Sequence, residues 1–255
     1  MASRITALIP AFNSLKLMPA LLDDLAWADQ ILVVDSFSTD GTVEYCRQRG
    51  ADVIQHEYIN SAKQKNWAIP QCAHEWVWLI DTDERVPPEL AAELQTLLRA
   101  GVPDDVDAYR VARKTMFVGE WLKVMNLYPD YQTRLFHRDK GRYEDKEVHA
   151  DVIVPGKIET LTGALIHNAT PTLSKQINLL DRYSRYQADE LYKRGVRYRW
   201  YNVTLRPIAV FFYLYLFQGG WRVGVRGLFI AFHTMAYTFF THAKLWEKDV
   251  LDTEK

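Results

Sequence analysis

Glycine-rich phosphate loops, abundant cysteine and a strong net charge are all missing from this 255-residue sequence. Two cysteines are too few for a disulfide framework. Neither Cys46 nor Cys72 has a metal-ligand neighbour at a useful spacing, so we interpret both as core residues. The patterns G-x-G-x-x-G and G-x-x-x-x-G-K-S/T do not occur, which excludes dinucleotide oxidoreductases and P-loop kinases. A formal net charge of -1 argues against a whole-protein electrostatic footprint for nucleic acid, so any basic surface for a partner must be local.

Long apolar runs are also missing. The two longest uncharged stretches, residues 207–221 and 227–243, are shorter than the ~20 residues that a spanning helix needs. The apolar stretch at residues 5–9 is shorter than the hydrophobic region of a signal peptide. We therefore expect a cytoplasmic N-terminus and no bilayer-crossing segment. An apolar content of 48% allows a large core, either in one α/β domain with an appendage or in two small domains.

The first hundred residues alternate between short apolar runs and helical segments. This alternation predicts an α/β fold with a parallel, doubly wound sheet. The expected strands are residues 5–9, 30–34, 52–55 and 76–80, and the expected helices are residues 18–28, a segment ended by Gly50, residues 62–73 and a segment from Pro87 to about residue 100.

The pattern changes after residue 101. Further strands without long helices between them are expected at residues 108–115, 132–137, 148–154 and 160–166, where they would extend the sheet. Helices are expected at residues 173–193, 200–217 and 221–245. We place a boundary near residues 169–171, so that residues 1–170 form a catalytic domain and residues 171–255 a helical region.

One stretch, residues 76–84 (WVWLIDTDE), contains an expected buried strand and, directly after it, three acidic residues. On extended backbone Asp81 and Asp83 point to one face, and Asp35 ends the second strand. The carboxyl ends of parallel strands meet at one edge, where α/β sheets bind ligands. Carboxylates that share a cation with phosphate oxygens are the usual magnesium or manganese arrangement. The plainer alternative is that Asp40, Asp83 and Glu84 only cap helices and line loops.

Several segments carry a family resemblance when taken together. Residues 9–13 (IPAFN), 33–42 (VVDSFSTDGT), 64–68 (QKNWA) and 79–85 (LIDTDER) match successive landmarks of family 2 glycosyltransferases in order and spacing. Two later segments, residues 128–136 (YPDYQTRLF) and 143–149 (YEDKEVH), narrow the resemblance to the branch of this family that resembles bacterial lipopolysaccharide core beta-glucosyltransferases. The resemblance covers about residues 5–168.

The resemblance implies a GT-A fold, Rossmann-like and mostly parallel, and inverting transfer from a nucleotide sugar. Asp35 would contact the uracil or ribose, and the loop of residues 10–13 would line the base pocket. Asp81 and Asp83 resemble a D-x-D motif that holds Mg²⁺ or Mn²⁺, with Asp83 the main ligand, Asp81 nearer the ribose and diphosphate, and His149 a further ligand. The implied donor-binding residues are Pro10, Ala11, Asn13, Asp35, Ser36, Lys65, Asn66, Asp81 and Arg134.

The resemblance also implies a catalytic base. Asp145 is the first candidate, with Glu144 and Glu147 in reserve, because a carboxylate must accept the proton of the acceptor hydroxyl. Asp130 and Gln132 would contact the acceptor. The chain departs from the pattern at Ala150, where relatives often have glutamate. The alternatives are that these acids are a solvated turn and that His149 is a packed or surface residue.

The C-terminal third combines basic and aromatic residues. Arginines and lysines precede the apolar run at residues 210–217, and Arg222 and Arg226 follow it. Such a pattern is typical of helices in a membrane interface that contains anionic lipid. The alternative is a helical subdomain packed on the catalytic domain or on a second subunit. RNA binding lacks a supporting motif. The basic residues before the run are Arg182, Arg185, Lys193, Arg194, Arg197, Arg199 and Arg206.

From these observations we expect a peripheral enzyme at the cytoplasmic face of the inner membrane. It would move a hexose, with glucose the first candidate, from a UDP-sugar to a lipid-linked saccharide such as the lipopolysaccharide inner core. Two rival interpretations are an aspartate-nucleophile phosphatase and a catalytically silent membrane scaffold. The sequence leaves open whether the chain forms a homodimer.

Overall fold

A computed structural model describes residues 2–144, 151–170 and 172–253. The chain divides into two compact units. The first comprises Met1–Lys114 with Pro129–Asn168, and the second comprises Thr115–Tyr128 with Ala169–Lys255. Residues 115–128 thus belong with the C-terminal helices, an association that the sequence pattern does not indicate.

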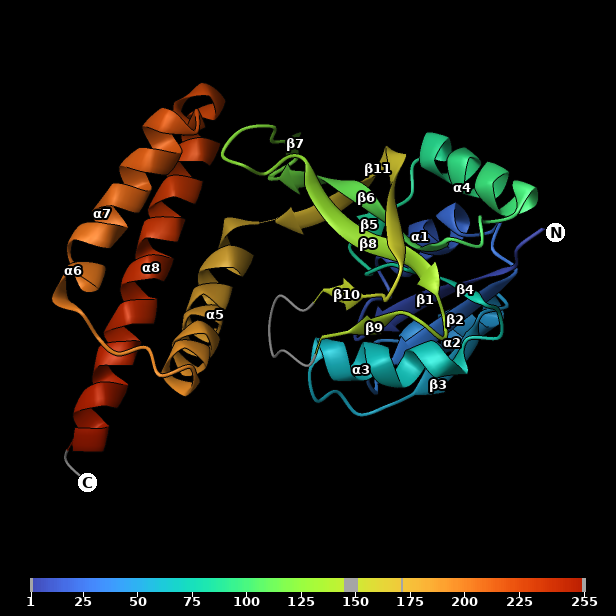
Figure 1. Cartoon of the computed structure of the whole chain (residues 1–255), viewed down its shortest axis with the longest axis horizontal. Coiled ribbons are helices and arrows are strands. Elements are labelled where there is room, and N and C mark those ends of the chain that lie inside the picture. Colours follow the sequence, from blue (N-terminus) through green and yellow to red (C-terminus); the bar gives the residue numbers. More distant parts are fainter. Residues whose placement is uncertain (1, 145–150, 171, 254–255) are drawn as a thin grey trace. The chain divides into compact units, whose positions relative to one another are not determined.

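Nine strands of the described residues form one mixed sheet in the order β3-β2-β1-β4-β8-β6-β11-β5, with β7 paired to β6 (Figure 1). Strands β3, β2, β1 and β4 are parallel, as expected, whereas β8 and β6 add antiparallel pairs. The strands are β1 (Ile5–Ala11), β2 (Gln30–Asp35), β3 (Asp52–Gln55), β4 (Trp76–Leu79), β5 (Glu84–Arg85), β6 (Val106–Phe117), β7 (Glu120–Trp121), β8 (Asp130–His137) and β11 (Lys157–Thr170).

A separate two-stranded sheet pairs β9 (Arg142–Tyr143) with β10 (Val152–Ile153). The strand expected at residues 148–154 therefore does not extend the main sheet where the structure describes it. The pairing in this short sheet runs between neighbouring segments of the chain, and period-2 alternation alone does not distinguish such a hairpin from a strand of the main sheet.

Helices of the first unit cover both faces of the sheet. Ile5, Ala7 and Ile9 of β1 join a buried cluster with α1 and α4, and Leu8 joins a second cluster with α3, because successive strand residues point to opposite faces. Burial on both faces also explains the continuous apolar sequence of β4. The helices are α1 (Met18–Asp24), α2 (Thr42–Gln48), α3 (Ser61–Ala68) and α4 (Pro88–Ala100).

Helix α3 is shorter than expected. It begins after Asn60, whose side chain accepts a hydrogen bond from the Lys63 amide at 2.8 Å. It ends at Ala68 and continues as a 3₁₀ turn at Ile69–Gln71, which contains Pro70. The proline has no amide hydrogen to donate to the preceding turn, so the α-helical hydrogen-bond pattern stops there.

The second unit is helical, and its helices are α5 (Leu173–Lys193), α6 (Trp200–Val203), α7 (Leu205–Phe212) and α8 (Gly224–Thr253). Helix α5 matches its expected bounds. The single helix expected at residues 200–217 is instead divided into α6, α7 and a π-helical turn at Tyr213–Phe217. Within this unit α8 packs against both α5 and α7 (Figure 1).

The segment Gly220–Asp252 is long and apolar enough to cross a membrane by length and composition, and most of its residues are exposed or half-buried. This finding corrects the expectation that no segment reaches that length. The expectation counted uncharged residues only, whereas the helix continues through the charged residues at both ends of that run. An exposed interfacial helix passes the same test of length and composition.

Candidate functional site

The carboxyl ends of the parallel strands bring the first candidate residues together. Ala11 at the end of β1 is the register partner of Asp35 at the end of β2. On the other side of β1, Leu8 pairs with Leu79 of β4, and Asp81 follows two residues later. The loop of residues 10–13, Asp35 and Asp81 therefore lie at one edge of the sheet, where α/β folds bind ligands.

Asp35 is fully buried, and its carboxylate organises the loop that follows it. The Ser38 amide donates to Asp35 Oδ2 at 2.9 Å, and the Ser38 hydroxyl donates to Oδ1. Gln55 Nε2 donates to Oδ2 at 3.0 Å. Beside it, the Ser36 amide donates to the Ala11 carbonyl at 2.9 Å, and the Ser36 hydroxyl accepts a bond from Gln64. These contacts hold the edge rigid.

The loops after β1 and β2 are tied to each other by side-chain bonds. Asn13 has a left-handed backbone with φ 46°, its amide donates to Ser38 Oγ at 2.8 Å, and its side-chain oxygen accepts the Thr39 amide at 2.9 Å. Phe12 and Phe37 on these two loops are more than half exposed. Sequence reasoning included Phe12 only as part of the loop of residues 10–13 and gave Phe37 no role, although each aromatic residue interrupts a polar loop that directly follows a strand.

Asp81 is held by two cations. Its Oδ1 lies 2.9 Å from Lys65 Nζ, and its Oδ2 lies 2.9 Å from Arg134 Nη2. Both cationic side chains are almost fully buried, whereas the Asp81 side chain is 34% exposed. Lys65 of α3, Arg134 of β8 and Asp81 after β4 thus meet at one point. All three are donor-binding residues expected from the sequence resemblance.

The ion network continues inward from Arg134. Its Nη2 also lies 2.5 Å from Glu84 Oε1, and Glu84 is fully buried. Arg113 lies 3.7 Å from the same Glu84 oxygen and pairs with Asp130 at 2.5 Å. Gln132 donates to the other Asp130 oxygen at 3.0 Å. Both expected acceptor residues therefore belong to this network, and sequence reasoning missed the contributions of Glu84 and Arg113.

These pairings shift the pKa values of the groups. Burial by itself raises the pKa of Asp81, but the attraction of Lys65 and Arg134 outweighs it and holds that pKa well below the usual range. Burial by itself lowers the pKa of Lys65 and of Arg134, but the neighbouring carboxylates raise both pKa values above their usual ranges. All three side chains are therefore ionised at neutral pH.

Asp83 has a different environment. Its side chain is 30% exposed, and its Oδ1 lies 3.6 Å from His167 Nε2 of β11. Its carbonyl accepts the Asn168 amide at 2.9 Å. His167 Nδ1 is buried and has no hydrogen-bond partner among the described residues. The pair offers one carboxylate and one imidazole to a cation, and sequence reasoning missed His167 because it lies 84 positions along the chain from Asp83.

Within the described ranges, no group of three or more His, Cys, Asp or Glu side chains is arranged to hold a metal ion. Magnesium and manganese sites commonly use one or two protein carboxylates, with phosphate oxygens and waters in the remaining positions. Asp83, with His167 beside it, fits that mode of binding. Asp81 fits it less well because both of its oxygens contact cationic side chains.

Tyr143, two residues before the expected base Asp145, lies beside the same network. Lys65 Nζ is 5.1 Å from the centre of the Tyr143 ring, and Asn66 exchanges two hydrogen bonds with the Tyr143 backbone at 2.8 and 2.9 Å. Glu144, next to Tyr143, bonds across to Asp151. The other three residues expected here, Asp145, Glu147 and His149, lie outside the described residues.

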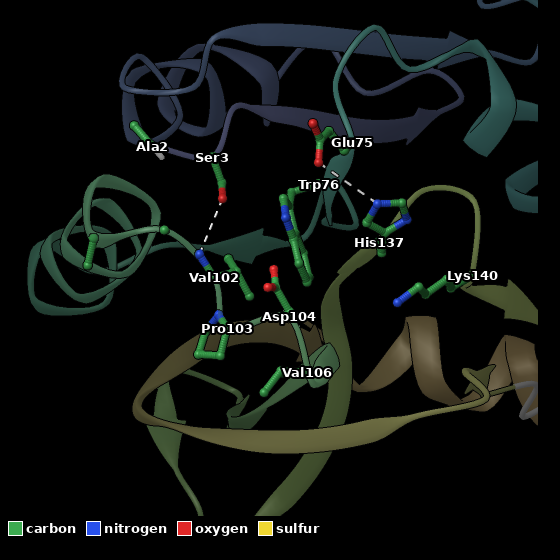
Figure 2. Close-up of a pocket in the computed structure, with 12 residues that line it drawn as sticks. Ala2, Ser3, Glu75, Trp76, Val102, Pro103, Asp104, Val106, His137 and Lys140 are labelled. Atoms are coloured by element: carbon green, nitrogen blue, oxygen red, sulfur yellow. Dashed lines mark hydrogen bonds and ion pairs between the residues drawn. The ribbon is translucent and has the colours of Figure 1, made fainter.

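A cavity of about 520 Å³ lies at the opposite edge of the sheet (Figure 2). Glu75 and Trp76 at the start of β4 line it, together with His137, whose imidazole lies 3.9 Å from the Glu75 carboxylate. The residues expected from the sequence do not line this cavity. Ligands of α/β sheets bind at the carboxyl ends of the strands, so we do not assign the reaction to it.

Comparison with known proteins identifies the class. A family model described as glycosyl transferase family 2 matches residues 6–153. The chain is 31% identical to lipopolysaccharide core biosynthesis glycosyltransferase LpsC of Rhizobium meliloti (strain 1021), over 97% of this chain and 93% of that protein. It is 27% identical to an uncharacterized glycosyltransferase of Rickettsia felis (strain ATCC VR-1525 / URRWXCal2), over 86% and 81%. The chain belongs to glycosyl transferase family 2.

A solved structure supports the fold. Mannosyl-3-phosphoglycerate synthase from Rubrobacter xylanophilus matches with a TM-score of 0.50 and 16% identity, over 78% of this chain and 77% of that one. At this identity the likeness concerns the fold alone. The expected GT-A, Rossmann-like fold class is confirmed, with a mixed sheet and a long apolar C-terminal helix. Family membership also sets aside the aspartate-nucleophile phosphatase.

Proposed function

We propose that this protein is an inverting hexosyltransferase that uses a UDP-sugar, with glucose the first candidate sugar. The proposed acceptor is a lipid-linked saccharide of the lipopolysaccharide inner core. The observation that carries the proposal is the meeting of Asp35, Asp81, Lys65 and Arg134 at the carboxyl edge of the sheet in a chain of this family. Its 31% identity to a lipopolysaccharide core enzyme supports the acceptor class.

The donor would bind across this edge. Asp35 is fully buried and holds in place the loop after β2, against which the uracil or ribose would lie, and the exposed rings of Phe12 and Phe37 offer apolar surface for the base. Lys65 and Arg134 lie where the diphosphate would sit beside Asp81. Fixed charges aimed at a leaving group that gains negative charge lower the barrier most effectively.

Charge balance supports a divalent cation. The cations Lys65, Arg134 and Arg113 are matched by the carboxylates of Asp81, Glu84 and Asp130, so the network has little positive charge left for a diphosphate. Asp83 would hold Mg²⁺ or Mn²⁺, with His167 beside it. A bound ion supplies Lewis-acid stabilisation of the departing diphosphate. The remaining side chains position the donor and keep the edge rigid.

The acceptor hydroxyl needs a base on the opposite side of the sugar from the leaving group. We keep Asp145 as the proposed base, with Glu144 and Glu147 as alternatives. Glu144 supports this location because its neighbour Tyr143 contacts Lys65 and Asn66 of the proposed donor site. Arg113 and Asp130 connect the same region to β6 and β8, where an acceptor would approach.

The proposed location is a membrane surface at the cytoplasmic face, and the exposed apolar residues of the second unit support the association with a membrane. On α7, Leu205, Ile208 and Phe212 are exposed at helical spacing. Exposed apolar residues at helical spacing on α8 form a second stripe. Such a large exposed apolar surface on one unit favours burial in lipid or against protein. The stripe on α8 consists of Val225, Leu228, Phe232, Phe239, Trp246 and Val250.

A turnover screen tests the enzymatic proposal. Purified full-length protein would be assayed against nucleotide sugars, with Mg²⁺ or Mn²⁺, on truncated lipopolysaccharide acceptors, for wild type, Asp83→Asn and the matched surface control Asp104→Asn. We expect transfer from one UDP-hexose by wild type and the control, and strong loss in Asp83→Asn. Absence of turnover with every donor, together with normal cellular function of Asp83→Ala, would favour the silent scaffold.

A further inference from the structure

A second, smaller cavity of about 280 Å³ lies within the helical unit, away from the residues used above. The loop of residues 123–128 forms one wall, and the turn between α7 and α8, residues 216–222, forms the other. Lys123 and Arg222 both line it, and no acidic side chain does. The cavity therefore presents positive charge to any group that enters it.

Neither cation is neutralised by a carboxylate in the part of the chain that the structure describes. Lys123 Nζ lies 4.2 Å from the centre of the Trp121 ring, and the Arg222 guanidinium lies 5.3 Å from the centre of the Trp221 ring. Cation–π contacts orient the side chains but leave their net charge in place. Four other arginines of this unit contact acids, namely Arg185, Arg194, Arg197 and Arg226, the last of which pairs with Glu120 at 2.8 Å.

The backbone around the cavity is held in an uncommon shape. Met125 and Asn126 have positive φ angles of 61° and 58°, and Gly219 on the facing turn has φ 77°. Left-handed backbone at two consecutive non-glycine residues costs about 1–2 kcal/mol each. The Met125 amide ties the walls together by donating to the Gln218 carbonyl at 2.9 Å. Strain that the surroundings maintain is more common at ligand sites than elsewhere.

Part of the cavity lining is apolar and exposed. Phe217 lines the cavity and is 79% exposed, and Leu216 beside it is half exposed. Val225, 79% exposed, begins the apolar stripe of α8. A cationic hollow bordered by exposed aromatic and aliphatic side chains is complementary to an anionic head group joined to hydrocarbon. Soluble anions would use the cations but not the apolar part of the lining.

We propose that this cavity binds the phosphate group of an anionic membrane lipid, between Lys123 and Arg222. The phosphate would accept hydrogen bonds from both side chains, while Phe217 and Leu216 enter the acyl region beside it. The inference rests on the proposed membrane association of the helical unit and not on the chemistry of sugar transfer. It gives that unit a specific lipid contact in addition to general attraction to a charged surface.

Vesicle flotation of the full-length protein tests it. One set of phosphatidylcholine vesicles would contain phosphatidic acid, and another would contain oleate, adjusted to the same surface charge. The variant Lys123→Gln/Arg222→Gln would be compared with the matched double variant Arg182→Gln/Arg199→Gln, which removes two exposed arginines outside the cavity. Circular dichroism and nucleotide-sugar turnover would verify that both variants fold.

Wild type should prefer the phosphatidic acid vesicles. Each cation near an anionic surface contributes about fivefold in affinity through general attraction, so either double variant should lose up to about 25-fold on both vesicles. Hydrogen bonds to the phosphate add to this attraction, so the cavity variant should lose more on phosphatidic acid than on oleate and should lose the preference. The control variant should weaken binding to both vesicles alike and keep the preference. Equal loss in both variants, or wild-type binding that does not distinguish phosphate from carboxylate, would overturn the site. If inorganic phosphate at low concentration abolishes the preference for phosphatidic acid vesicles, the cavity is a site for soluble anions and the proposal is overturned.

Discussion

Replacing Arg134 with methionine tests the ion network at the sheet edge. Arg134 is almost fully buried, and its Nη2 bridges Asp81 Oδ2 at 2.9 Å and Glu84 Oε1 at 2.5 Å. Methionine has a similar length but no charge and no donor. Glu84 would stay fully buried with Arg113, 3.7 Å away, as its remaining cation. Asp81 would keep Lys65.

The expected cost follows from that geometry. Removal of one partner from a buried ion pair costs about 3–5 kcal/mol, because the other charge stays buried without compensation. Arg113 offsets part of this for Glu84, so we expect the lower end, about 3 kcal/mol. For a domain of this size that corresponds to a fall in Tm of about 6–12 °C. Arg49→Met, which breaks an exposed pair with Asp23, should cost much less, because solvent screens the attraction between exposed charges.

Urea and thermal unfolding, followed by circular dichroism, would measure both variants. A third protein, Arg134→Met/Glu84→Gln, also removes the negative charge of Glu84. It keeps an oxygen at that position for the Asp81 amide, which donates to Glu84 Oε2 at 3.1 Å. It should therefore be more stable than Arg134→Met alone. The reasoning fails if Arg134→Met costs no more than Arg49→Met, or if the double variant is the less stable of the two.

Three further predictions concern other parts of the chain. Burial raises the pKa of Cys46 to about 11 and that of Cys72 to about 12, so iodoacetamide at pH ~8 should modify both thiols far more slowly in native than in urea-unfolded protein, as read by mass spectrometry. Fast native labelling would contradict this burial. Because the folded-state pKa of Asp81 is depressed, its contribution to stability is complete above about pH 4 and is lost as the pH falls further. Asp81→Asn should flatten that acid dependence in urea titrations, and an unchanged slope would count against the pairing. Gly227→Ala would place a methyl group 1.9 Å from the Gly220 carbonyl oxygen and should destabilise the helical unit by about 1–3 kcal/mol. If amide hydrogen exchange in α8 is as slow in this variant as in wild type, the close approach is contradicted.

Local sequence patterns were sufficient for much of the fold. Strand β3 at Asp52–Gln55 and helix α5 at Leu173–Lys193 match their expected bounds because period-2 and helical spacing, with turn residues at the ends, are local properties. Helix α3 ended early at Pro70, a stop signal already present in the sequence. The order of antiparallel strands after β4 depends on pairing between distant segments, which no local pattern specifies.

The sequence predicted part of the candidate site, as it predicted part of the fold. Asp35 and Asp81 were expected at one edge of the sheet because each comes at or just after the carboxyl end of a parallel strand. The partners of those acids were harder to infer. Arg134 lies 53 positions from Asp81, and His167 reaches Asp83 only through the pairing of β11 with β5. Glu84 was interpretable only as a loop acid until its burial against Arg134 was known.

The most direct test of the proposed donor site is calorimetric binding of UDP as a function of Mg²⁺ or Mn²⁺ concentration. Wild type and the surface control Asp104→Asn should bind UDP more tightly as the metal is added. Asp83→Asn should lose most of that metal-dependent gain and stay folded. If Asp83→Asn binds UDP and metal as wild type does, or if wild type does not bind UDP at any metal concentration, the acids at this sheet edge do not form a nucleotide-sugar site.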